Sequence, residues 1–131
     1  MNGLLLFFEQ ADAVPLQWLA TLGPVFVDGG DRWLVSTTNS YIALGEYVHF
    51  DLEYDEEDGC AILDWIKFQK AWFVEWNDVS LLLKFLAQIP FEMRIVIDND
   101  YGLICDFDQL RGVPVAKWIR AAALPERLVW N

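Results

Sequence analysis

The sequence predicts an α+β fold in which about three helices pack on a mostly antiparallel sheet. Short apolar segments separated by Gly, Pro, Asn and Asp predict strands that are joined by turns. Glycine and proline signals beside longer apolar patterns predict the helices. The 131 residues contain no internal repeat, low-complexity tract or Pro/Ser-rich linker, so we expect a single globular domain over residues 1–131.

The strands are predicted from apolar runs and from alternation. Alternation is clearest within residues 41–54, where Val48 and Phe50 alternate with His49 and Asp51. One face of this strand is apolar and the other is charged, as in an antiparallel strand with one side in water. The remaining strands are expected over residues 3–8, 25–27, 32–37, 91–97 and 103–107.

The helices are predicted from their end signals. Pro15 suits the first turn of a helix that the Gly-Pro pair at 23–24 ends. Asn77 or Asp78 caps a second helix that runs to about Gln88, and its many apolar residues predict packing on more than one side. A third helix is expected after Gly112 and Pro114, with an inward face of Val115, Trp118, Ile119 and Ala122.

Composition is that of a folded protein without a membrane span. Hydrophobic residues make up 55% of the chain and charged residues 22%, which argues against disorder. No apolar run approaches the length that a membrane-spanning helix requires. Cys60 and Cys105 lie far apart, without zinc-site or CxxC spacing, so we expect reduced, largely buried thiols in a cytoplasmic protein.

The charge balance indicates which partners to expect. Twenty acidic and nine basic side chains give a formal net charge of −11. Direct binding to nucleic acid or to an anionic membrane is disfavoured, because both depend on cationic side chains. A strongly acidic protein instead attracts basic proteins over a distance. A role of the charge in solubility alone is the alternative.

Acidic residues are concentrated in one segment. Residues 46–58 hold seven of the twenty acidic residues and no Lys or Arg: Glu46, Asp51, Glu53, Asp55, Glu56, Glu57 and Asp58. Such a cluster repels itself unless solvent or a partner relieves the repulsion. A solvated loop, a surface for a basic protein and a divalent-cation site are the three interpretations. A calcium loop is disfavoured, because the spaced D-x-D-x-D-G pattern is missing.

His49 is the single histidine and shares its predicted strand face with Asp51 and Glu53. This trio could act in acid–base chemistry or bind a metal. One histidine without a second His or a suitably placed Cys is a poor transition-metal site, so a surface histidine is favoured. Because no nucleotide-binding, hydrolase or zinc-protease motif occurs, we expect no catalytic residue, no cofactor and no metal.

A second carboxylate set lies on the predicted C-terminal hairpin and consists of Asp98, Asp100, Asp106 and Asp108. Asp98 and Asp100 are typical turn residues. An acidic ridge continuous with residues 46–58 is the functional alternative.

Residues 60–76 fit either strands or a helix, and their β-branched and aromatic content favours strands. Alternation then places Trp72 and Trp76 on one strand face and Phe73 on the other. Core packing explains these aromatic residues, and a role as hot spots of an interface is the alternative.

In size and charge the chain resembles the small acidic immunity proteins that bacteria make against the toxins of contact-dependent or secretion-delivered competition. No signature motif accompanies the resemblance. It implies a non-enzymatic inhibitor that binds a basic toxin domain, often a nuclease, and blocks the active site with carboxylates in place of phosphates. The interface on that interpretation consists of Tyr47, His49, Asp51, Glu53, Asp55, Glu56, Glu57, Asp58, Trp72 and Trp76.

Two other functions are compatible with the sequence. A DNA-mimic inhibitor, such as an anti-restriction factor, predicts acidic residues spread in a long double row. A small enzyme that uses His49 with Asp51 or Glu53 predicts a concave pocket around the imidazole.

Overall fold

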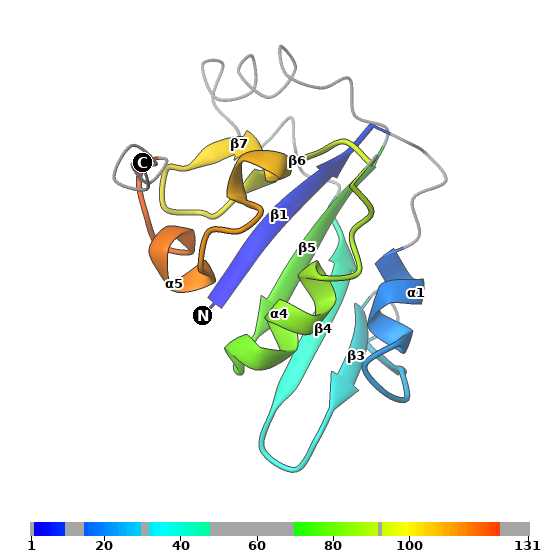
Figure 1. The fold of residues 1–131 in the computed structure, drawn as a ribbon. Coiled ribbons are helices and arrows are strands. Elements are labelled where there is room, and N and C mark those ends of the chain that lie inside the picture. Colours follow the sequence, from blue (N-terminus) through cyan, green and yellow to red (C-terminus); the bar gives the residue numbers. More distant parts are fainter. Residues whose placement is uncertain (1, 10–14, 30–31, 48–69, 92, 124–131) are drawn as a thin grey trace.

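The computed structural model describes residues 2–9, 15–29, 32–47, 70–91 and 93–123 (Figure 1). These residues form a seven-stranded antiparallel sheet, in the order β2-β3-β4-β5-β1-β6-β7, together with three α-helices. The predicted α+β class is thereby confirmed. The strands are β1 (Asn2–Phe8), β2 (Phe26–Asp28), β3 (Arg32–Ser36), β4 (Tyr41–Glu46), β5 (Lys70–Trp76), β6 (Ile95–Asp98) and β7 (Ile104–Asp106). The helices are α1 (Pro15–Ala20), α4 (Val79–Leu86), α5 (Val115–Trp118) and the short 3₁₀ helix η1 (Phe107–Leu110).

Most of the strand predictions agree with the structure. The strands expected at 3–8, 25–27, 32–37 and 103–107 correspond to β1, β2, β3 and β7, whereas the strand expected at 91–97 begins only at Ile95, as β6, because Phe91 lies in a turn. The strand expected over residues 41–54 is present as β4 up to Glu46, and its part from residue 48 onward lies outside the described residues. Within the segment 60–76, residues 70–76 form β5, while 60–69 lie outside the described residues.

β1 lies between β5 and β6, and side chains on both of its faces are buried. Leu6 stands opposite Trp72 of β5 and opposite Ile97 of β6. On the same face as Leu6 lies the main core, whereas Phe7 points to the other face and packs with a smaller cluster there. A strand buried on both faces is apolar throughout, which explains the unbroken apolar run near the N-terminus.

The helices α1, α4, η1 and α5 contribute their buried residues to the main core, on one side of the sheet (Figure 1). We call this side the helix-covered face. The Trp18 ring of α1 stacks on Phe8 of β1 at a centroid distance of 5.7 Å and meets Phe85 of α4 edge-on at 5.9 Å. One indole therefore joins two helices to the central strand.

α4 packs on one side only, so the prediction of packing on more than one side was wrong. Leu81, Leu82, Phe85 and Leu86 are buried against the sheet, as the 3.6-residue period of a helix requires. Val79 and Leu83, which fall on the opposite side, are roughly half exposed. The helix begins as expected, because the Asp78 carboxylate accepts a hydrogen bond of 2.9 Å from the amide of Ser80.

Asn99 fixes the turn between β6 and β7 to the C-terminal helix. Its side chain is fully buried, and its Nδ2 donates to the carbonyls of Trp118 and Ala121, both at 2.8 Å. Its Oδ1 accepts from the amides of Tyr101 and Leu103, at 2.9 and 3.1 Å. All the hydrogen-bonding groups of this buried amide are thus engaged.

The inward face predicted for the third helix is only partly correct. Val115 and Trp118 are buried and Ile119 is partly buried, but Ala122 is exposed. The reason is that regular helix ends at Trp118, so the helical spacing no longer determines which side Ala122 faces.

The first prediction concerns Asn99. Replacement of Asn99 by Ala should lower the free energy of unfolding by about 2–4 kcal/mol, because it removes four hydrogen bonds, two of them buried and two partly buried. Chemical denaturation measures the change, with the exposed loop substitution Asn39→Ala as a control. Equal stability of the two variants would show that water replaces these hydrogen bonds.

The second prediction concerns the pH dependence of α4. Hydrogen bonds from the Ser80 amide, the Ser80 hydroxyl and the Ser40 hydroxyl lower the pKa of Asp78. A lowered pKa stabilises the fold at pH values above the unfolded-state pKa, and the stabilisation is lost as the pH falls through the lower folded-state pKa. Wild type should therefore melt at a higher temperature than Asp78→Asn at neutral pH, and the gap should close in acid.

Thermal melts across this pH range measure that gap. Asp100→Asn is the matched control, since it removes one negative charge from an exposed turn residue. A neutral-pH gap for Asp78→Asn no larger than that of the control would contradict the capping argument.

Candidate partner-binding surface

Three of the residues predicted to bind a partner lie within the described part of the chain: Tyr47, Trp72 and Trp76. Tyr47 directly follows β4, where its amide donates to the carbonyl of Ala71 at 2.9 Å. Its partly buried side chain packs against the small cluster of Phe7, Ala71 and Val96, on the face opposite the helices. The other predicted residues lie outside the described residues: His49, Asp51, Glu53, Asp55, Glu56, Glu57 and Asp58.

Trp72 and Trp76 lie in the main core, with exposed fractions of 5% and 4%. Both belong to the helix-covered face, where Trp72 stands opposite Leu6 of β1. The ring of Trp33 lies 5.9 Å from that of Trp72. Core packing, the alternative that the sequence left open, accounts for these positions. The apolar part of a partner-binding surface is therefore better sought among residues that are exposed.

Charge is nearly balanced within the described residues. They contain nine acidic and seven basic side chains, an excess of two acids. Five ion pairs connect them, among which Lys70 Nζ lies 2.8 Å from Glu46 and Arg111 Nε lies 2.6 Å from Asp108. Most of the net charge of −11 must therefore come from the rest of the sequence. Residues 48–69 alone contain seven acidic residues and one lysine.

A polar network on the face opposite the helices illustrates this internal balance. Arg32 of β3 bridges Asp28 of β2, at 2.9 Å, and Glu75 of β5, at 3.5 Å. The hydroxyl of Tyr41 donates to the other oxygen of Glu75 at 2.9 Å, and this hydrogen bond, aided by burial, raises the pKa of Tyr41. The Glu75 carboxylate is thus held within the fold by one ion pair and one hydrogen bond. The sequence did not reveal this network, because its four residues lie on four different strands. They come together only through the pairing of those strands in the sheet.

The second carboxylate set has structural partners. Asp98 Oδ1 accepts from the amide of Asp100 at 2.8 Å, and Asp100 has a φ of 66°, a left-handed conformation that Asp and Asn tolerate in turns. Asp106 lies 3.4 Å from Arg94 Nε, and Asp108 pairs with Arg111. These contacts support the interpretation of Asp98 and Asp100 as turn residues. The proposed continuity with residues 46–58 falls outside the described residues.

Phe91 is the most exposed of the large hydrophobic side chains in the described residues, at 77%. Phe91 follows α4, and the Arg111 guanidinium stacks on its ring, with 4.5 Å between the guanidinium carbon and the ring centroid. The same guanidinium stacks on Phe107 at 4.8 Å and donates to the carbonyls of Ile89 and Pro90, at 3.2 and 2.8 Å. Arg111 therefore fixes the backbone that carries Phe91.

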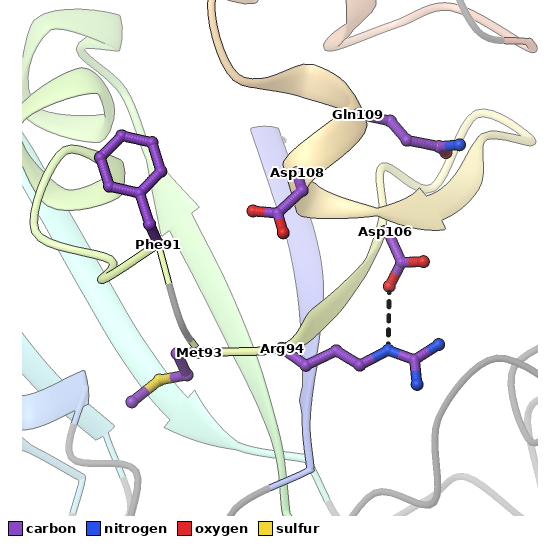
Figure 2. A pocket seen from close by; sticks show the side chains of 6 residues that line it. All are labelled: Phe91, Met93, Arg94, Asp106, Asp108 and Gln109. Carbon is purple, nitrogen blue, oxygen red and sulfur yellow. Dashed lines mark hydrogen bonds and ion pairs between the residues drawn. The ribbon is translucent and has the colours of Figure 1, made fainter.

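Two hollows flank the Phe91 ring. One has a volume of about 330 Å³ and is lined by Phe91, Met93, Arg94, Asp106, Asp108 and Gln109 (Figure 2). We call it the Phe91 pocket. The second, of about 310 Å³, is mostly apolar and lies where the end of α4 meets η1 and α5, with Leu83, Leu86, Phe107 and Trp118 in its wall. Both combine concave shape with an exposed aromatic side chain, as binding sites do.

The described ranges contain no group of three or more His, Cys, Asp or Glu side chains arranged to hold a metal ion. They also contain no helix that is both long and apolar enough to cross a membrane. The buried thiol of Cys105, which is 1% exposed, agrees with the expectation for this residue, whereas Cys60 lies outside the described residues.

The third prediction concerns Arg111. Replacement of Arg111 by Ala should destabilise the fold by about 2–3 kcal/mol, because the carbonyls of Ile89 and Pro90 and the Asp108 carboxylate lose their charged donor. Denaturant unfolding measures the loss, and Lys117→Ala, which truncates an exposed basic side chain on α5, is the control. A loss equal to that of the control would mean that Arg111 does not hold this loop.

A comparison of the chain with protein families, curated proteins and solved structures finds no match.

Proposed function

We propose that this protein is a non-enzymatic inhibitor that acts in the cytoplasm by binding a basic protein partner, as an immunity protein neutralises its toxin. The observation that carries the proposal is the uneven distribution of charge. Acids and bases nearly balance within the described fold, whereas residues 48–69 carry seven acids against one lysine. A segment with six more acidic than basic side chains is suited to an external cationic surface.

The proposed mechanism is occlusion of a cationic surface. A toxin that cleaves nucleic acid must hold phosphates with Lys and Arg, so carboxylates presented at similar spacing compete for the same positions. Asp51, Glu53, Asp55 and Glu56, with their acidic neighbours up to Asp58, supply these carboxylates in the proposal. Electrostatic attraction also accelerates association, which suits an inhibitor that must capture a toxin before the toxin acts.

The fourth prediction tests this function. Tagged protein should retain one basic partner from a lysate of the source organism, in a stoichiometric complex. The variant Glu56→Gln/Glu57→Gln should bind that partner at least about tenfold more weakly, with a weaker dependence of the association rate on salt, because both carboxylates contribute to attraction. Titration of the purified partner by calorimetry and stopped-flow fluorescence measures both quantities.

The matched control is Glu9→Gln/Asp100→Asn, which removes two negative charges from exposed positions elsewhere. It should bind nearly as wild type does. Expression of the partner alone should also arrest growth of the bacterial host, and co-expression of this protein should restore it. If no stoichiometric partner is retained, or if both double variants bind equally, the acidic segment is a solvated loop and the proposal is overturned.

A further inference from the structure

We infer that the small cluster of Phe7, Ala71 and Val96 is the docking surface for residues 48–69 of the same chain, whose apolar ends pack on it. The docking itself does not depend on the proposed function. Its consequence for a partner, that the acidic residues are presented on the face opposite the helices, rests on that function. The supporting observations are the burial of the cluster, the position of two strand ends and the composition of the segment.

Phe7 and Val96 are fully buried, although they lie on the face opposite the helices. The buried residues of α1, α4, η1 and α5 all belong to the main core on the other face. Within the described chain, the partly buried apolar side chains packed against the small cluster are those of Leu5, Tyr47 and Ile104, which belong to the sheet or directly follow a strand. Neighbours in one sheet layer shield a side chain laterally but not from above, so a second layer must lie over these residues.

Among the large apolar side chains of the described strands, complete burial on this face is confined to one end. Leu5 lies two residues before Phe7 on β1 and is only partly buried, as is Phe73, which stands opposite Leu5 on β5. Phe26, on the edge strand β2, is 57% exposed. The covering layer is therefore needed where β4 ends and β5 begins, beside the small cluster.

The chain leaves the sheet and returns to it at this point. β4 ends at Glu46, and the next residue, Tyr47, packs its side chain on the small cluster. β5 begins at Lys70, and Ala71 is itself a member of the cluster. The amide of Tyr47 donates to the carbonyl of Ala71 at 2.9 Å, so the two ends are adjacent. Residues 48–69 are thus attached at both ends beside the surface that must be covered.

The composition of residues 48–69 fits this position. An acidic run at residues 55–58 separates two stretches that are rich in apolar side chains. These side chains are Val48, Phe50 and Leu52 before the run and Ile62, Leu63, Trp65, Ile66 and Phe68 after it. Packing of both stretches on the small cluster removes apolar surface from water and leaves the carboxylates of the run solvated.

Docking of this kind gives the acidic residues a defined place. Val48 and Phe50 alternate with His49 and Asp51, so contact of the first pair with the small cluster turns the second pair outward, as in an extended strand. A basic partner then binds on the face opposite the helices, beside Tyr47. A segment held in this way also loses less conformational freedom on binding than a free one.

Nuclear magnetic resonance of the whole chain, without a partner, tests the docking. Nuclear Overhauser effects from the Val96 methyl groups should reach side-chain protons of residues 48–54 or 60–69. Val79, a half-exposed valine of α4, is the matched control and should show no such effect to these residues. Isotope-filtered spectra of mixed labelled and unlabelled protein distinguish contacts within one chain from contacts between two copies.

A protease assay tests the same docking by its rate. Lys67 is the only Lys or Arg within residues 48–69, so trypsin has a single cleavage site there. Val96→Thr keeps the side-chain shape but places a hydroxyl in the small cluster, and should accelerate cleavage after Lys67 severalfold. Val79→Thr should leave the rate unchanged. Cleavage after Lys117, which is exposed on α5, should not accelerate to the same extent, and an equal rise at both sites would contradict the docking.

The outcomes separate this inference from the proposed function. Overhauser effects from Val96 to residues 48–54 or 60–69 of the same chain support the docking. Effects that reach only other segments such as residues 124–131, or only a second copy, overturn it. If the docking is found but no basic partner is retained, the inference stands and the proposed function falls. If the docking is contradicted while a basic partner is retained, the proposed function stands without this placement.

Discussion

The antiparallel pairing of β1 with β5 is the constraint on which the rest of the structure depends. Seven residues of each strand are in register, and Leu4 and Leu6 of β1 stand beside Val74 and Trp72 of β5 at the base of the main core. Because these two strands are neighbours at the centre of the sheet, β4 extends the sheet on one side and β6 on the other. The helices can bury their apolar faces only after this surface exists, since isolated helices of six to eight residues are unstable in water.

In the C-terminal part of the fold, two polar side chains add hydrogen bonds to the packing of apolar residues such as Phe107 and Trp118 in the main core. Asn99 joins the β6–β7 turn to the residues after α5 through four hydrogen bonds. Arg111 joins η1 to the loop after α4 and supports the exposed ring of Phe91. Both side chains make several hydrogen bonds to backbone groups of short, irregular connections. The Phe91 pocket lies beside the loop that Arg111 contacts.

Charge is distributed unevenly along the chain, which the net charge alone does not show. Five of the nine acidic side chains in the described residues form ion pairs, with Arg32, Lys70, Arg94 or Arg111 as the basic partner. The acidic excess is carried chiefly by residues 48–69. A protein of this construction combines a nearly neutral scaffold with a concentrated source of negative charge. That arrangement supports the proposed binding to a cationic partner, because such a partner would also relieve the repulsion among the clustered carboxylates.

The sequence by itself determined the fold class, most of the strand positions and the start of α4, because apolar periodicity and the capping residue Asp78 are local signals. It also located the acidic excess in residues 48–69, because the acidic and basic residues of a segment can be counted directly. Strand order, the burial of Trp72 and Trp76, and the exposure of Val79 and Leu83 were decided only by tertiary structure. Periodicity states which residues share a face but not what covers that face. The same limit applies to Phe91 and Asp108, which are brought to one pocket by contacts between segments well separated in the chain.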